Sequence, residues 1–192
     1  MDLMKRRRNL LIGKPKPYDT EIEYLMGDGK AYINTGLRGN LNTEIGITFT
    51  PSSTALSPMM GSRKGNNNIT VWVNGNTAAD QRFGAWNTKK TFNVGTQYEV
   101  SINKTSLIVN GDVTQINYST TFTTNSNIGI FTVFNGYYGT CRVFSAYIKQ
   151  DGVLAQDLIP VRVGQVGYLY DKVSGQLFGN VGTGNFILGP DI

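Results

Sequence analysis

The chain has 192 residues, 23 of them glycine and 16% of them charged, with one cysteine, no histidine and a formal net charge of +5. Such a length fits one β domain with an appendage, and the composition favours short strands and tight turns over helices. Without histidine the commonest general base and metal ligand is missing, and a single cysteine excludes a disulfide framework or a thiolate cage.

The first 19 residues are expected to form an arm in front of the domain, and they carry the whole net charge. Residues 1–16 hold six basic side chains against Asp2, whereas the rest of the chain has 12 basic and 12 acidic side chains. A neutral domain argues against a nucleic-acid-binding face on the globular part. The basic run of the arm consists of Lys5, Arg6, Arg7 and Arg8.

Three readings of this basic run stay open: it binds phosphates of nucleic acid, an acidic membrane surface, or an acidic groove of another protein. The apolar residues around it are too few for a membrane-binding face and too short a stretch for a signal peptide. We expect the arm to dock on a partner protein, with residues 14–17, Lys-Pro-Lys-Pro, as an extended spacer. A disordered, solvated leader is the alternative.

The domain spans residues 20–192 as a series of short predicted strands. Residues 21–36 predict a strand, a Gly-Asp-Gly turn and a second strand, and residues 43–50 alternate with Ile45, Ile47 and Phe49 facing inward. Further strands are predicted at residues 59–63, 68–74, 81–86, 97–103, 105–110, 112–116 and 127–134. Asn110-Gly111 joins two of them and is the strongest short hairpin signal. This pattern predicts an all-β fold, a two-sheet antiparallel β-sandwich of the jelly-roll kind.

The segment 140–149 predicts an interior strand. Alternation places Phe144, Ala146 and Ile148 on one face, and residues 143, 145 and 147 on the other. Both faces are largely apolar, so the strand is expected to be covered on both sides. Cys141 within it is expected to be a small buried hydrophobe.

Several segments resemble one known module. They are Glu23-Tyr-Leu followed by Tyr32-Ile-Asn-Thr-Gly36, Gly61-Ser-Arg63, residues 142–149, Asp157-Leu-Ile-Pro160, and the ending 167–186. They are similar to the concanavalin A-like, laminin-G-like lectin/glucanase jelly rolls of tailed-phage virion proteins and gut-bacterial surface proteins. The likeness covers residues 21–190 and leaves out the arm, whose first eight residues are similar to the starts of phage structural proteins. It implies a jelly roll that serves as a sugar-binding domain, a decoration protein, a fibre tip or, occasionally, a hydrolase.

The sequence lacks the paired carboxylates that a hydrolase would need. Glycoside hydrolysis needs two of them across the scissile bond, and the only acidic pair that alternates along a predicted strand is Glu21 and Glu23, at the start of the domain. Asp112, Asp151 and Asp171 fall at predicted turns, where aspartate bonds to the backbone. The acids are scattered and no phosphate-binding loop occurs. We therefore expect no catalytic residue, no cofactor and no metal.

A sugar-binding reading needs exposed aromatic side chains beside amides or carboxylates. Tyr137 and Tyr138, which lie between two glycines, are the loop candidates. Trp72 and Trp86 lie within predicted strands and are expected to belong to the core. The asparagine-rich stretches at residues 66–68 and 74–76 supply polar loops.

The sequence therefore predicts a non-enzymatic structural protein of a virion, made in the host cytoplasm. Its arm is expected to hold it to a capsid or tail protein as a capsid decoration or fibre protein. The alternative is a carbohydrate-binding adhesin that recognises a host surface glycan. A homo-oligomer stays open, and neither nucleic acid nor a membrane is expected as a partner.

Overall fold

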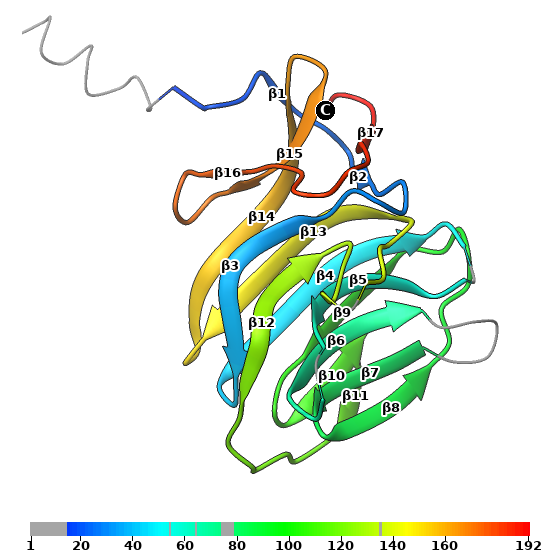
Figure 1. Ribbon diagram of the computed structural model, residues 1–192, viewed down its shortest axis with the longest axis vertical. Helices are drawn as coiled ribbons and strands as arrows, with labels where there is room; N and C mark the ends of the chain where they lie inside the picture. Colours follow the sequence, from blue (N-terminus) through cyan, green and yellow to red (C-terminus); the bar gives the residue numbers. More distant parts are fainter. Residues whose placement is uncertain (1–14, 54, 64, 74–78, 135) are drawn as a thin grey trace, which may run out of the picture.

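The computed structural model describes residues 15–192 except residues 54, 64, 74–78 and 135, and the side chains of residues 79 and 80 are also outside the description. Within this part the chain forms strands and turns but no helix, so none of its elements is a helix suited to crossing a membrane. Two antiparallel sheets pack against each other across one core (Figure 1). The predicted all-β sandwich is confirmed.

The larger sheet has eleven strands in the described chain, and its main path runs in the order β11-β10-β9-β4-β13-β14-β15-β16. In addition, β1 pairs with β14, and β2 pairs with both β13 and β17. The bounds of these strands are β1 Thr20–Glu21, β2 Leu25–Met26, β4 Thr43–Pro51, β9 Tyr98–Ile102, β10 Ser106–Val109, β11 Asp112–Gln115, β13 Cys141–Gln150, β14 Val153–Val163, β15 Val166–Asp171, β16 Leu177–Phe178 and β17 Ile187–Leu188.

The smaller sheet runs in the order β3-β12-β5-β6-β7-β8. Its strands are β3 Ile33–Asn40, β5 Ser57–Ser62, β6 Asn68–Val73, β7 Ala79–Gly84, β8 Trp86–Lys90 and β12 Thr123–Ile130. Its inner face supplies Ile69 and Val71, and the larger sheet supplies Ile45, Ile47 and Phe49, all of them at most 2% exposed. The predicted inward alternation of residues 43–50 is therefore confirmed.

Trp72 is buried, as predicted, and the Arg63 guanidinium lies 4.1 Å from the centroid of its ring. Trp86 is only partly buried against the core. The strand predicted at residues 81–86 is in fact two strands, because Gly84 has a φ of +59° and turns the chain from β7 into β8.

Two other local predictions have different outcomes. Asn110 and Gly111, with φ of 49° and 87°, form the predicted hairpin turn between β10 and β11. The strand predicted at residues 127–134 instead begins at Thr123 and ends at Ile130. It ends there because Phe131 has a φ of 64°, which an extended strand does not accommodate.

The predicted assignment of side chains to the two faces of β13 is wrong in the first half of the strand. Val143 pairs with Phe49 and Ser145 with Thr48, so Phe144 is an extra residue, a β-bulge. The bulge places Val143 on the buried face and leaves Phe144 partly exposed on the other face, beside the ring of Tyr24. The outer face of β13 is thus only partly covered.

Strand β14 runs from one end of the sandwich to the other. Its last residues pair with β1, and Ile22 bridges to Asp191 nearby, so the base of the arm and the C-terminus share one end, named here the terminal end. At the other end of β14, Val153 pairs with Gln150 across the β13–β14 turn. The β3–β4 and β9–β10 turns also lie there, and this is the turn end. The β13–β14 and β3–β4 turns are at the lower left of Figure 1. The two ends are roughly 33 Å apart at about 3.3 Å per residue of strand.

Candidate functional site

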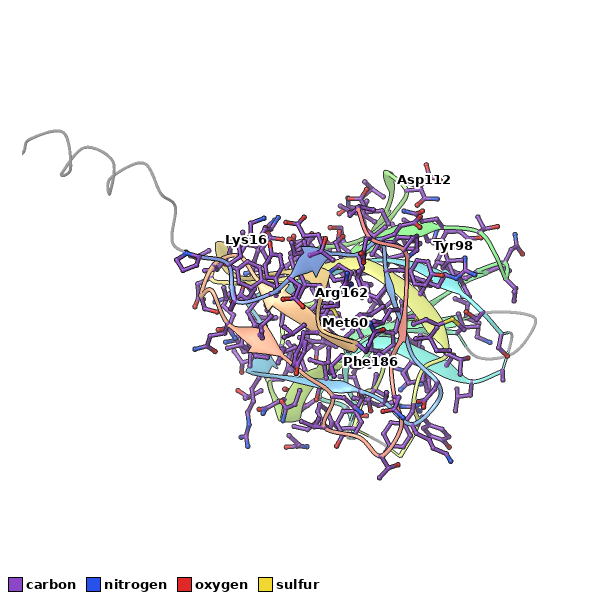
Figure 2. All side chains as sticks on the ribbon, turned by 90° about the horizontal axis from the view of Figure 1, so that it is seen from above. Lys16, Met60, Tyr98, Asp112, Arg162 and Phe186 are labelled. Atoms are coloured by element: carbon purple, nitrogen blue, oxygen red, sulfur yellow. The ribbon has the colours of Figure 1, made fainter. Side chains whose placement is uncertain are left out.

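The predicted partner-binding residues Lys5, Arg6, Arg7 and Arg8 lie outside the described residues, which begin at Pro15. The residues that follow contact the domain closely. Lys16 Nζ lies 2.8 Å from Glu21 Oε1, and the Tyr18 hydroxyl donates to the same oxygen at 2.8 Å. The base of the arm is therefore held on the sandwich at the terminal end, onto which Figure 2 looks down with Lys16 labelled.

Two further contacts fix this base. The ring of Tyr18 packs edge-on against Tyr170, with centroids 4.9 Å apart. The Gly164 amide donates to Asp19 Oδ2 at 2.7 Å. The hydrogen bonds from Lys16 and Tyr18 hold the pKa of Glu21 below its ordinary value.

The C-terminal segment is tied to the same place. Arg162 donates from Nε and Nη2 to the two carboxylate oxygens of Asp191, at 2.8 Å and 2.6 Å. This two-bond pairing lowers the pKa of Asp191. It therefore holds the last residues of the chain beside β14, next to the base of the arm.

The two acids weighed for hydrolysis, Glu21 and Glu23, have different surroundings. Glu21 is engaged by Lys16 and Tyr18, whereas the Glu23 side chain is exposed and its backbone amide donates to Pro190 O at 2.8 Å. Neither residue lines the pocket described below. The lowered pKa of Glu21 suits an ionised carboxylate and not a proton donor.

Tyr137 and Tyr138 lie in the loop between β12 and β13, and their exposed fractions are 43% and 38%. Tyr138 stacks on Tyr32, with centroids 5.3 Å apart and ring planes at 25°, and Tyr32 meets Phe134 edge-on. One face of Tyr138 is thus occupied within the protein. Tyr137 offers the more exposed ring.

The polar groups beside this aromatic cluster hold loops together. Asn180 Oδ1 accepts from the Tyr32 amide at 3.1 Å, and Asp28 Oδ2 accepts from the Asn185 amide at 2.7 Å. Burial alone would raise the pKa of Asp28, but the backbone amides of Asn185, Ala31 and Lys30 lower it below its ordinary value. These side chains thus join the loops that surround the cluster.

The turn end contains a pocket of about 410 Å³ that the sequence did not predict, named here the turn-end pocket. It lies among the β3–β4, β9–β10 and β13–β14 turns. Its polar lining comes from Asn42, Glu44, Asn103, Lys104, Lys149 and Asp151, and Leu41 adds an apolar side chain.

Glu44 is the centre of this lining. Its Oε1 accepts from the Tyr147 hydroxyl and from Lys149 Nζ, each at 2.8 Å, and its Oε2 accepts from Asn103 Nδ2 at 3.0 Å. Burial alone would raise the pKa of Glu44, but these hydrogen bonds lower it below its ordinary value. Burial and the bond to Glu44 raise the pKa of Tyr147 to about 12. The carboxylate is thus held ionised by three neighbours.

Asn42 connects the other two turns. Its Nδ2 donates to Asp151 Oδ1 at 2.8 Å, and its Oδ1 accepts from Lys104 Nζ at 3.1 Å. Asp151 has a φ of 52°, a conformation that aspartate and asparagine tolerate better than most residues. The three turns are therefore held in one arrangement around the pocket.

Sequence patterns gave no signal for this pocket. Asn42 and Asp151 are separated by 109 positions in the chain and meet only because β4 pairs with β13. Cys141 is fully buried, as predicted, and burial raises the pKa of its thiol, which makes it unreactive. Among the described residues, no group of three or more acidic, cysteine or histidine side chains is placed to hold a metal ion.

A scan against protein-family models found no match, and a search of curated proteins found none either.

Proposed function

We propose that this chain is a non-enzymatic structural protein of a phage virion, a capsid decoration or fibre protein anchored to a capsid or tail protein by its N-terminal arm. The observation that carries the proposal is the fixed base of the arm at Lys16, Tyr18 and Asp19. A basic segment joined to a neutral sandwich at one fixed point suits an anchor. An anchored domain then projects its turn end away from the particle.

The states of the carboxylates support a role without catalysis. Among the described residues, Glu21, Asp28, Glu44 and Asp191 each have a pKa below the ordinary value. Glu21, Glu44 and Asp191 each accept a hydrogen bond from a lysine or arginine side chain. Asp28 accepts hydrogen bonds from backbone amides. Acids held in this way join parts of the fold, as expected of a structural protein.

The experiment is incorporation of tagged protein into particles during assembly. The full chain is compared with a chain lacking residues 1–14 and with a triple variant in which Arg6, Arg7 and Arg8 are alanine. We expect both variants to fold and to be lost from purified particles, because charge-assisted hydrogen bonds contribute about 1.5–3 kcal/mol each before ordering costs.

A triple lysine variant separates charge from shape. We expect it to be retained only in part, because lysine keeps the charge but lacks the planar guanidinium. Raised salt should weaken attachment of the unmodified chain. Incorporation of the truncated chain at the level of the full chain would refute the anchor.

The second candidate function is a carbohydrate-binding adhesin, favoured by the exposure of Tyr137 and Tyr138 in a loop. The test is a glycan array probed with the full chain and with a Tyr137→Ala variant. Binding that disappears in the variant would support the adhesin, and an array without signal would count against it.

A further inference from the structure

The charges of the domain are divided unevenly between its two sheets. Residues 52–97, which contain strands β5 to β8 of the smaller sheet, hold five basic side chains and one acidic residue, Asp80. The other residues after position 16 hold seven basic and eleven acidic side chains. The neutral sum therefore conceals a basic smaller sheet and an acidic remainder.

The strand register places basic side chains on the outer face of the smaller sheet. Thr70 alternates with the core residues of β6, so its side chain lies on the outer face. Arg82 of β7 pairs with Thr70 on one side and with Asn87 of β8 on the other. Lys89 lies two residues beyond Asn87 and is exposed. Arg82 and Lys89 thus share the face of Thr70.

Two arginines extend this surface towards β3. The Arg63 guanidinium lies 4.1 Å from the centroid of the Trp72 ring, and Trp72 also alternates with the core residues of β6. Arg38 of β3 is exposed, and the next residue, Gly39, faces the core, where a Cβ atom would meet Ile69. We name this surface the basic face, and its basic side chains are Arg38, Arg63, Arg82 and Lys89.

The basic face is wide and polar. Arg38 and Lys89 lie on the opposite edge strands β3 and β8 (Figure 1), which are five strand spacings or roughly 24 Å apart. Within the described part of the chain, none of the large exposed apolar side chains belongs to a strand of this sheet. The core of a protein–protein interface is apolar and poor in charge, whereas nucleic-acid interfaces are more polar and much more positive. The face therefore suits a nucleic acid better than an acidic protein.

We propose that the basic face binds the phosphate backbone of a nucleic-acid duplex through Arg38, Arg63, Arg82 and Lys89. One strand of duplex DNA carries a phosphate about every 3.4 Å along its axis, so the face spans roughly seven phosphates. Recognition is by charge, and no base sequence is read. The proposal differs from the expectation that the net charge of the domain gave, because that sum takes no account of how the charges are placed.

The experiment measures the binding of a fluorescent duplex of about 20 base pairs by anisotropy, from about 50 to 200 mM salt. The background is the full chain in which Arg6, Arg7 and Arg8 are alanine, so that the arginines of the arm do not contribute. We expect saturable binding that weakens steeply with salt, because each neutralised phosphate releases counterions. The result does not depend on whether the arm anchors the protein.

A double variant in this background tests the basic face. Arg38→Gln with Lys89→Gln should weaken binding about tenfold and reduce the slope of log affinity against log salt by about two, since two phosphate contacts are lost. The matched control is Arg142→Gln with Lys104→Gln, which removes an exposed arginine and an exposed lysine outside the smaller sheet. The control should bind within about twofold of the background. Thermal unfolding of both variants checks that the fold is kept.

Three results would overturn the proposal. One is the absence of duplex binding by the background chain at the lowest salt. Another is an equal loss of affinity in the double variant and in the control, which would mean that the smaller sheet has no special part in binding. The last is binding of polyglutamate as tightly as the duplex, with the same dependence on Arg38 and Lys89, which would assign the face to an acidic protein.

Discussion

At the scale of single residues, Gly46 determines how Tyr147 lies on the larger sheet. A Cβ atom at position 46 would overlap the Tyr147 ring. The ring can therefore cross β4 at this position only because glycine has no side chain. From there its hydroxyl reaches Glu44 at 2.8 Å. One glycine thus permits the hydrogen bond that helps to hold the centre of the turn-end pocket.

Replacing Gly46 by alanine should lower the free energy of unfolding by about 1–3 kcal/mol, the usual cost of overpacking. The change should cost little in a chain that already carries Tyr147→Ala, because the overlapping ring is gone and alanine suits a strand better than glycine. Urea unfolding of the two single variants and the double variant measures this coupling. If Gly46→Ala lowered the free energy of unfolding equally with and without Tyr147→Ala, the ring would not require the glycine.

The lowered pKa of Glu44 predicts a pH dependence. Between the folded and unfolded pKa values the unfolded chain binds more protons, so stability rises with pH. The contribution of Glu44 is complete above the unfolded value of about 4.3 and is lost as the pH falls through the lower folded value. Glu44→Gln should therefore reduce stability at pH 7 and flatten the acid limb of a plot of unfolding free energy against pH.

The control for this prediction is Glu23→Gln, a change of the same kind at an exposed side chain. It should leave both the stability at pH 7 and the acid limb close to those of the unmodified chain. An unaltered acid limb in Glu44→Gln would mean that other carboxylates account for the acid sensitivity.

At the scale of elements, the bulge in β13 decides which side chains enter the core. Alternation alone puts Phe144 with Ala146 and Ile148, but one extra residue in the pairing with β4 moves Val143 to that face instead. Residues after the bulge keep the faces that alternation predicts. The error is therefore confined to the residues before Ser145.

Deleting Phe144 should leave a folded protein, because Val143 and Ser145 then follow each other opposite Phe49 and Thr48. Some stability is lost with the edge-on contact between Phe144 and Tyr24. Deleting Ala146 instead should prevent folding. On one side of the deletion the buried side chains would then point to the outer face of the sheet and the outer ones to the core. Circular dichroism and amide dispersion of the two variants check this. A folded Ala146 deletion, or an unfolded Phe144 deletion, would contradict the assignment of the bulge.

The sequence predicted most strands because alternation, as in residues 43–50, reports directly which face is buried. The Asn110-Gly111 turn was also readable, because its residues tolerate positive φ. The bulge at Phe144 and the end of β12 before Phe131 could not be predicted, because both depend on partners that are distant in the chain. The turn-end pocket could not be predicted for the same reason: its polar side chains come from three turns that only strand pairing brings together.

At the scale of the whole molecule, the two ends of the sandwich differ in what they hold. The terminal end holds the base of the arm, the C-terminal residue and the loop with Tyr137 and Tyr138. The turn end holds the polar pocket. Because of this separation, substitutions at one end should leave the contacts of the other end intact.

Removing residues 1–14 should leave the unfolding temperature unchanged, whereas removing residues 1–18 should lower it. The longer deletion takes away the Tyr18 ring, which is 9% exposed and packs on Tyr170, and its hydrogen bond to Glu21. Burial of such a ring is worth about 1.5–3 kcal/mol. Calorimetry of the two truncated chains measures the difference, and Tyr18→Phe isolates the hydrogen bond. Equal unfolding temperatures for the two truncations would mean that the base of the arm is not part of the stable fold.

The shortness of β1 has a mechanical consequence. Tension applied through the arm first loads the contacts of Lys16, Tyr18 and Asp19. It then reaches Thr20 and Glu21, whose pairing with β14 is only two residues long. Peeling residues 15–21 away would lengthen the chain by roughly 25 Å, at about 3.3–3.6 Å per residue. Ile22, which is 1% exposed and bridged to Asp191, is the point at which the core itself begins to bear the load. A domain pulled by its arm is thus expected to yield by a short extension before Ile22 and the residues that follow it are disturbed.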